Sequence, residues 1–232
     1  MTSSEFRDRL SRRAGNADIW LSSAVVEQLE AYYRLLARWN RKVNLTAFQL
    51  DEFNDQAVDR LIVEPLAAAC FVPNSPLVWF DLGSGGGSPA VPLKIVRPAA
   101  LLIMIESNAR KATFLREAVR TLGLGQASVE NARFEGVATG ASPGGAELVT
   151  VRAVKTDEKL FGVARALLRE GGRLVLFRTN GSSIAPPRGF QLLDSVRVAK
   201  LDKASRIVAS RIVALERTLD VPRGTEGSPQ TH

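Results

Sequence analysis

The chain has 232 residues, of which 45% are hydrophobic and 24% charged, proportions typical of a globular protein with one domain, or one domain and a small appendage. A single cysteine excludes an internal disulfide framework and a cysteine metal cluster, and the only histidine is the last residue, so neither acid–base nor metal chemistry by histidine is expected. The longest apolar run, residues 66–72, is too short to span a membrane, and no apolar segment follows the arginines of residues 1–20, so we expect a cytoplasmic protein without membrane contact.

The net charge of +7 is distributed unevenly along the chain. Residues 1–150 carry 16 Lys and Arg against 16 Asp and Glu, whereas residues 151–232 carry 15 against 8. Most of these cations are arginines, and the planar guanidinium of arginine suits phosphate better than the ammonium of lysine. The excess indicates a nucleic-acid partner, and a solvated arginine-rich surface is the alternative.

Residues 1–70 are predicted to form a helical extension that packs on the core. Ser22 or Ser23 can cap a helix whose apolar residues recur at helical spacing as far as Asn40. A second helix is predicted over residues 51–70, and Pro65 must kink or divide it.

From residue 77 onward, strands alternate with helices. Strands are predicted at 77–82, 101–106, 127–132, 147–154, 173–178, 190–201 and 206–217. Helices are predicted after the glycines of residues 83–87, over 108–124, and over 160–172 with a stop at the terminal glycine pair. The pattern predicts a doubly wound, mainly parallel, Rossmann-like α/β sheet over 71–222, with the last two strands antiparallel at one edge and a disordered tail at 223–232.

The segment FDLGSGGGSPAVPL (80–93) joins the first strand to the first helix of this sheet. Glycines there permit a tight turn and let ligand atoms approach the backbone beside a helix N-terminus. Pro89 and Pro92 fit within the first helical turn, where a missing N–H group costs little. A strand, a glycine turn and a helix in this order are typical of the place where an α/β sheet binds a nucleotide-like ligand.

Two acids flank this loop and bear on the choice of ligand. Asp81 directly precedes the turn, where its charge would oppose a pyrophosphate but suits a ligand with a sulfonium and an ammonium group. Glu106 closes the second strand, where an acid can accept both ribose hydroxyls. No Walker lysine follows the glycines. The loop therefore favours S-adenosylmethionine over NAD or ATP.

These segments resemble the bacterial GidB/RsmG family of small-subunit ribosomal RNA guanine-N7 methyltransferases, over roughly residues 29–215. The similar segments are WNRKVNLTA (39–47), DLGSGGGSPAVPLKIVRP (81–98), IESNARKATFL (105–115), ARFEGVA (132–138), VRAV (151–154) and GGRLVLF (171–177). The resemblance implies a methyltransferase sheet, S-adenosylmethionine as cofactor, and a monomer that acts on 16S ribosomal RNA or the small ribosomal subunit. Guanine N7 is itself a nucleophile, so catalysis by positioning would suffice.

Candidate site residues follow from the loop and from the resemblance together. The cofactor-binding candidates are Asp81, Gly83, Ser84, Gly85, Gly87, Pro89, Glu106, Ser107, Arg133, Phe134, Glu135 and Arg152. Arg152 is also the candidate catalytic residue, with a surface arginine at a strand end as the alternative. Substrate contacts are predicted for Asn40, Asn44 and Arg178, although the asparagines could instead fix the turn after their helix, and Arg178 could be purely structural.

Three departures from the family pattern leave two other functions open. The family's H-x-x-D-S reads Arg60-Leu61-Ile62-Val63-Glu64 here. Its loop has Ser88 where an aromatic residue or leucine is usual and Ala90 in place of a glycine, and its L-K-G reads Phe177-Arg178-Thr179. The alternatives are a methyltransferase of a small molecule or protein, and an RNA-binding module that binds the cofactor without turnover.

Overall fold

A computed structural model describes residues 2–50, 54–137, 144–179, 185–198 and 210–218. Within these residues seven strands form one sheet in the order β3-β2-β1-β4-β5-β7-β6. The strands are β1 Val78–Leu82, β2 Leu101–Ile105, β3 Ala127–Glu130, β4 Ala146–Arg152, β5 Leu168–Thr179, β6 Phe190–Val198 and β7 Ser210–Arg217. The first five are parallel, and β7 runs antiparallel between β5 and β6. The predicted doubly wound sheet with an antiparallel edge is confirmed.

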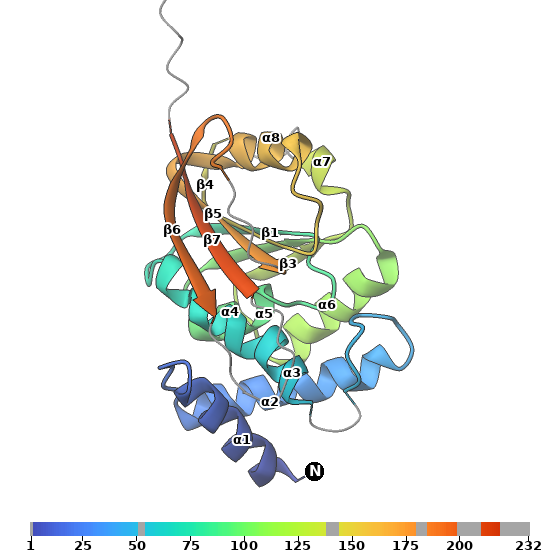
Figure 1. Ribbon diagram of the computed structural model, residues 1–232. Coiled ribbons are helices and arrows are strands. Elements are labelled where there is room, and N and C mark those ends of the chain that lie inside the picture. The colour runs from blue at the N-terminus through green and yellow to red at the C-terminus, as the bar shows by residue number, and fades with distance from the viewer. Residues whose placement is uncertain (1, 51–53, 138–143, 180–184, 199–209, 219–232) are drawn as a thin grey trace, which may run out of the picture.

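Helices cover both faces of this sheet (Figure 1). They are α1 Ser3–Gly15, α2 Ser23–Asn40, α3 Asp55–Val58, the π-helix η1 Asp59–Val63, α4 Glu64–Ala67, the 3-10 helix η2 Ala68–Phe71, α5 Ala90–Val96, α6 Ala109–Thr121, α7 Phe134–Val137 and α8 Glu158–Leu167. One apolar cluster joins the helices from α1 to α6 to the sheet face that carries Trp79, and a second joins α8 to the face that carries Phe80. Residues 1–70 thus share a core with the sheet, and a boundary at residue 70 stays a prediction.

Helix α1 was not predicted from the sequence. Thr2 and Glu5 form a capping box at its start, but its apolar face is narrow, with Phe6, Leu10 and Ala14 as its buried apolar residues. Ion pairs supply the rest of its attachment, because Arg13 contacts both Asp55 and Asp59. These partners lie more than forty residues away along the chain, where no local pattern can reveal them.

Two predicted helices differ in detail from the observed elements, one in its internal turns and one in its C-terminal boundary. The helix predicted over 51–70 is, within its described part, a succession of short α, π and 3-10 turns from Asp55 to Phe71, in which Pro65 lies in the first turn of α4. The helix predicted over 160–172 ends at Leu167, and β5 starts at the next residue. The glycine pair lies in an irregularity of β5, where a Cβ atom on Gly172 would approach the carbonyl oxygen of Arg169 to 2.8 Å.

Part of the C-terminal third lies outside the described residues. The tail predicted over 223–232 is one such segment, as are residues 199–209, which include the end of one predicted strand and the start of the next. Within the described residues, no helix combines the length and the apolar character needed to cross a membrane.

Candidate active site

A pocket of about 340 Å³ opens at the carboxyl ends of β1, β2 and β4. Its walls are formed by Leu36, Leu45, Thr46, Phe48, Arg60, Leu61, Gly83, Ser84, Gly85, Gly86, Ser88, Glu106, Lys111, Arg152, Ala153 and Val154. Chain order reverses between β1 and β4, because β2 and β3 follow on one side of β1 and β5 lies on the far side of β4. Open α/β sheets bind ligands at this switch point.

The glycines of the loop allow close packing at some positions and leave the backbone open to the pocket at others. Gly83 and Gly87 have positive φ angles, and a Cβ atom on either would approach a valine methyl group to 2.7 or 2.8 Å. Gly85 also has a positive φ, but its Cβ position has no neighbour closer than 3.8 Å. Among the predicted loop residues, Gly83, Ser84 and Gly85 line the pocket, whereas Gly87 and Pro89, the cap of α5, lie behind its wall.

Asp81 is buried directly before this loop, with 1% of its surface exposed, and it does not itself line the pocket. Its Oδ1 atom accepts a hydrogen bond of 2.5 Å from the hydroxyl of Thr150, and its Oδ2 atom has no partner. Burial raises the pKa of Asp81 to about 6. A buried carboxylate with an unpaired oxygen is costly unless a cation or a donor approaches it.

Glu106 forms the second acidic position and lines the pocket. Its Oε2 accepts from the N–H of Gly85 at 2.8 Å and its Oε1 from the N–H of Asn108 at 2.7 Å. Each carboxylate oxygen can accept a further hydrogen bond, so the side chain retains capacity for hydroxyl groups. Asn131, which the sequence did not single out, donates to the carbonyl oxygens of Glu106 and Ser107 and fixes the backbone there.

Arg152 is not a surface arginine, since only 10% of its side chain is exposed. Its Nη1 donates to the carbonyl oxygen of Arg60, its Nη2 lies 3.1 Å from Oε2 of Glu64, and its guanidinium lies 4.7 Å from the ring centre of Phe177. Burial lowers its pKa to about 10 and Glu64 opposes that shift, so Arg152 stays protonated. Its Nε and Nη2 atoms are buried without a hydrogen bond.

Two of the departures from the family pattern meet at this wall of the pocket. Nη1 of Arg60 donates to both carboxylate oxygens of Glu64, at 2.6 and 2.7 Å. The hydroxyl of Ser88 donates to the carbonyl oxygen of Leu61 at 2.8 Å and so ties the glycine loop to η1. Glu64 was noted in the sequence only as a departure. Its burial beside two arginines makes it the acid that balances Arg152.

The remaining predicted residues do not line the pocket. Asn40 accepts from the N–H groups of Leu45 and Thr46, both at 2.9 Å, and so fixes the turn that brings these residues to the pocket, while Asn44 is exposed. The remaining cofactor candidates are exposed or half-buried near the ends of β2 and β3: Ser107, Arg133, Phe134 and Glu135. Arg178 is half-buried at the end of β5. The ligand contacts assigned to these residues stay predictions.

Comparison with known proteins bears directly on this site. The GidB family, described as rRNA small subunit methyltransferase G, matches residues 25–185. The chain belongs to the GidB family. That match runs from α2 through β5 and contains every residue that lines the pocket.

Relatives of the chain carry the same description. A ribosomal RNA small subunit methyltransferase G of Stenotrophomonas maltophilia strain K279a is 38% identical over 164 residues, which cover 71% of this chain and 74% of that protein. A protein of the same description from Halorhodospira halophila is 34% identical over 172 residues, which cover 74% of this chain and 78% of that protein. This GidB chain is therefore similar to them over most of both lengths.

Solved structures with the same fold are more distant. A SAM-dependent methyltransferase from Aquifex aeolicus superimposes with a TM-score of 0.55 at 13% identity, over 70% of this chain and 93% of that one. The [4+2]-cyclase SpnF superimposes with a TM-score of 0.56 at 14% identity, over 73% of this chain and 84% of that one. Since one of the two is described as a cyclase, the fold alone does not decide the chemistry of the GidB site.

Proposed function

We propose that this protein transfers the methyl group of S-adenosylmethionine to N7 of a guanine in 16S ribosomal RNA, acting as a cytoplasmic monomer. The observation that carries the proposal is a pair of opposite charges at the switch point of a GidB sheet. Oδ2 of Asp81 and Nε of Arg152 are buried there without a hydrogen bond, and Nη2 of Arg152 has only the ion pair with Glu64. Buried polar atoms without partners are rare in folded proteins, and a ligand that supplies both charges would satisfy them.

The residues present fit this cofactor. Its amino-acid end carries an ammonium and a carboxylate group, which we assign to Asp81 and Arg152, and Glu106 is placed to accept hydroxyl groups of the ribose. Gly83 and Gly85 leave the backbone of the loop open to the pocket. When bound, S-adenosylmethionine supplies a methyl group on a positively charged sulfur.

Guanine N7 carries a lone pair in its neutral form, so no residue has to remove a proton before transfer. No histidine occurs among the described residues that line the pocket, in keeping with this requirement. The task left to the chain is to hold the base in line and to exclude water. Leu36, Leu45 and Phe48 form an apolar wall that serves this purpose.

Cations around the pocket suit a phosphate backbone. Arg60 and Lys111 line it, and Lys42 is exposed beside the turn that carries Leu45. We assign to these side chains, together with Asn44 and Arg178, the contacts that position the RNA. Phosphate contacts of this kind fix orientation rather than sequence.

A transfer assay tests the proposal. Protein, methyl-labelled S-adenosylmethionine and small subunits or 16S RNA from a strain without a GidB protein are incubated, and the nucleosides are analysed by mass spectrometry. One 7-methylguanosine per RNA is expected. Glu106→Ala is expected to reduce the yield strongly. Glu117→Ala, which removes a half-buried acid of α6 that pairs with Arg120, is expected to leave the yield unchanged. Label in protein or a small molecule, or binding without transfer, would contradict the proposal.

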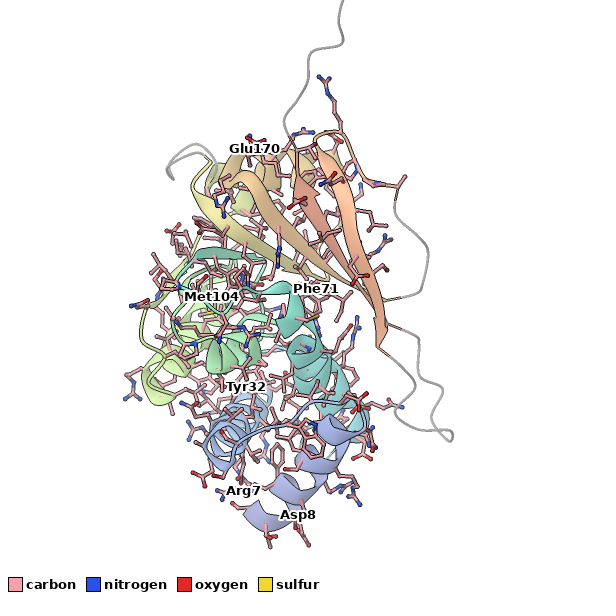
Figure 2. The ribbon with its side chains drawn as sticks, turned by 90° about the vertical axis from the view of Figure 1, so that its left-hand side faces the viewer. Arg7, Asp8, Tyr32, Phe71, Met104 and Glu170 are labelled. Atoms are coloured by element: carbon pink, nitrogen blue, oxygen red, sulfur yellow. The ribbon has the colours of Figure 1, made fainter. Side chains whose placement is uncertain are left out.

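Tyr32 links helix α2 to the cofactor loop and gives a second prediction. It lies between the N-terminal helices and the sheet (Figure 2), and its hydroxyl donates to the carbonyl oxygen of Gly86 at 2.7 Å. Tyr32→Phe leaves that carbonyl unpaired, so we expect a loss of about 1 kcal/mol in unfolding free energy and weaker cofactor binding. Urea unfolding and isothermal titration measure the two quantities.

Tyr33→Phe is the matched control, because Tyr33 is also buried and its hydroxyl bonds with the backbone of Asn54. It is expected to lower stability and to leave cofactor affinity unchanged. Equal losses of affinity in both variants would mean that the effect of Tyr32 is general destabilisation.

A further inference from the structure

A line of three buried polar side chains crosses from β1 to β4 beneath the pocket. Trp79 and Thr150 have no exposed surface, and Asp81 is 1% exposed. The indole Nε1 of Trp79 lies 2.8 Å from Oγ1 of Thr150, which lies 2.5 Å from Oδ1 of Asp81. Asp81 and Thr150 are register partners, and Trp79 precedes Asp81 by two positions on the same face of the sheet.

The chemistry of these groups fixes the direction of both hydrogen bonds. An indole N–H can only donate, so the Thr150 oxygen accepts from Trp79. The hydroxyl has one proton, which is therefore donated to Oδ1 of Asp81. A neutral Asp81 could carry its proton on Oδ2 and still accept this hydrogen bond, but the bond is stronger when the acceptor is the charged carboxylate. The arrangement therefore favours the ionised carboxylate.

We infer that Trp79 and Thr150 are positioning residues, which hold Asp81 as an ionised acceptor of fixed orientation and leave its Oδ2 atom for a cationic ligand. The identity of that ligand as S-adenosylmethionine rests on the proposed function. The positioning itself is a property of the protein without ligand, and it can be measured there.

The electrostatic surroundings show why such positioning matters. Burial raises the pKa of Asp81 to about 6, whereas the hydrogen bond from Thr150 and the nearby hydroxyl of Ser84, which donates to the backbone carbonyl of Asp81, lower it. Arg152 at the end of β4 lowers it as well, whereas Glu106 at the end of β2 raises it. Tyr32 of α2 also faces this group, in its neutral form, because burial raises the pKa of its hydroxyl. Loss of the bond from Thr150 would move the titration of Asp81 up toward neutral pH.

The decisive experiment is a ¹³C NMR titration of the Asp81 carboxyl group in the protein without cofactor, assigned by comparison with Asp81→Asn. Thr150→Val keeps the shape of the side chain and removes the hydroxyl, and it is expected to raise the pKa of Asp81 by about one unit. Thr150→Ser is expected to restore it. Trp79→Phe, which frees the hydroxyl to rotate, is expected to raise it by less.

Thr121→Val is the control, since the hydroxyl of Thr121 bonds Glu117 on the exposed side of α6. An unchanged Asp81 titration in both Thr150→Val and Trp79→Phe would overturn the inference. If Thr150→Val does not fold, the comparison of Trp79→Phe with Thr150→Ser still tests the inference. Trp79→Phe is expected to raise the pKa of Asp81, whereas Thr150→Ser is expected to leave it at the parent value.

Binding of S-adenosylmethionine as a function of pH separates this inference from the proposed function. Affinity in the parent protein is expected to fall as the pH drops through about 6, and in Thr150→Val at a pH about one unit higher. A parent protein that binds no S-adenosylmethionine at any pH would refute the proposed function. The NMR titration would still decide the roles of Trp79 and Thr150.

Discussion

Asp81→Asn is expected to make the cofactor-free protein more stable at pH 8 and, in the same molecule, to weaken cofactor binding. Burial raises the pKa of Asp81 from 3.8 to about 6, so the folded state binds the proton more tightly than the unfolded state. Between these two pH values the unfolded chain is ionised while the folded chain retains its proton, and stability falls as the pH rises. Above pH 6 the folded protein bears the full cost of the buried charge of Asp81, and below pH 3.8 it bears none of this cost.

The size of the effect follows from the shift. A rise of about two units in the pKa of Asp81 lowers the free energy of unfolding at neutral pH by roughly 3 kcal/mol. The amide nitrogen of the new asparagine takes the place of an oxygen that has no partner, and an unpaired buried donor costs about 1–3 kcal/mol. We therefore expect a net gain of up to about 2 kcal/mol at pH 8 and no gain at pH 4.

Urea unfolding of both proteins across this pH range measures the gain, and the values at pH 4 serve as the internal control. Isothermal titration at pH 8 is expected to show S-adenosylmethionine bound more weakly by about 1–3 kcal/mol, since a hydrogen bond to a charged group is lost. A variant that is stabilised equally at pH 4 and pH 8 would show that the charge of Asp81 is not what limits stability.

Arg152→Ala is expected to reduce both stability and cofactor affinity. It removes one of the two cations beside Glu64, whose side chain is only 2% exposed, and leaves that carboxylate with Arg60 alone. Breaking a buried ion pair from one side costs about 3 kcal/mol or somewhat more. Loss of the guanidinium also removes the group that we assign to the carboxylate of the cofactor, with an expected tenfold or greater loss of affinity, about 1.5 kcal/mol or more.

A double variant separates these two consequences. Arg152→Met with Glu64→Gln fills similar volume and removes both charges of this pair, and the amide oxygen of the new glutamine can still accept from Arg60, whose side chain is 20% exposed, so the double variant is expected to recover part of the stability. It cannot bind a carboxylate, so its cofactor affinity is expected to stay low. Chemical unfolding and isothermal titration give the two values for each variant. If the double variant bound the cofactor as tightly as the parent protein, Arg152 would have only a structural role.

Much of the sheet and half of the site could be predicted because their signals are local. Apolar runs marked four of the five parallel strands, and Asp81 and Glu106 stand near strand ends that a short motif identifies. Thr150 could not be found in this way, since its bond to Asp81 depends on the register of strands 69 residues apart in the chain. The same limit applies to the contact of Glu64 with Arg152, which depends on how η1 and α4 pack against the end of β4.

Motif similarity alone does not decide the role of a single residue. Arg133 and Glu135 belong to a segment that resembles the family pattern, yet both are exposed and neither lines the pocket. Asn40 matches the family as well, and its amide is engaged with the backbone of the following turn. A motif reports that a residue type recurs, whereas its role depends on the contacts that its side chain makes in the folded chain.

The place of β7 in the sheet connects a distant segment of the chain to the pocket. Phe177, whose ring lies beneath Arg152, pairs through β5 with Arg152 on one side and with Ile212 of β7 on the other. A chain that stopped before residue 210 would leave β5 as an open edge strand, with unpaired backbone groups exposed to other chains. Early termination would thus damage the platform under Arg152 and promote aggregation, although no described residue after Val154 lines the pocket. We therefore expect the proposed cofactor site to reach its final form only after β7 has joined the sheet.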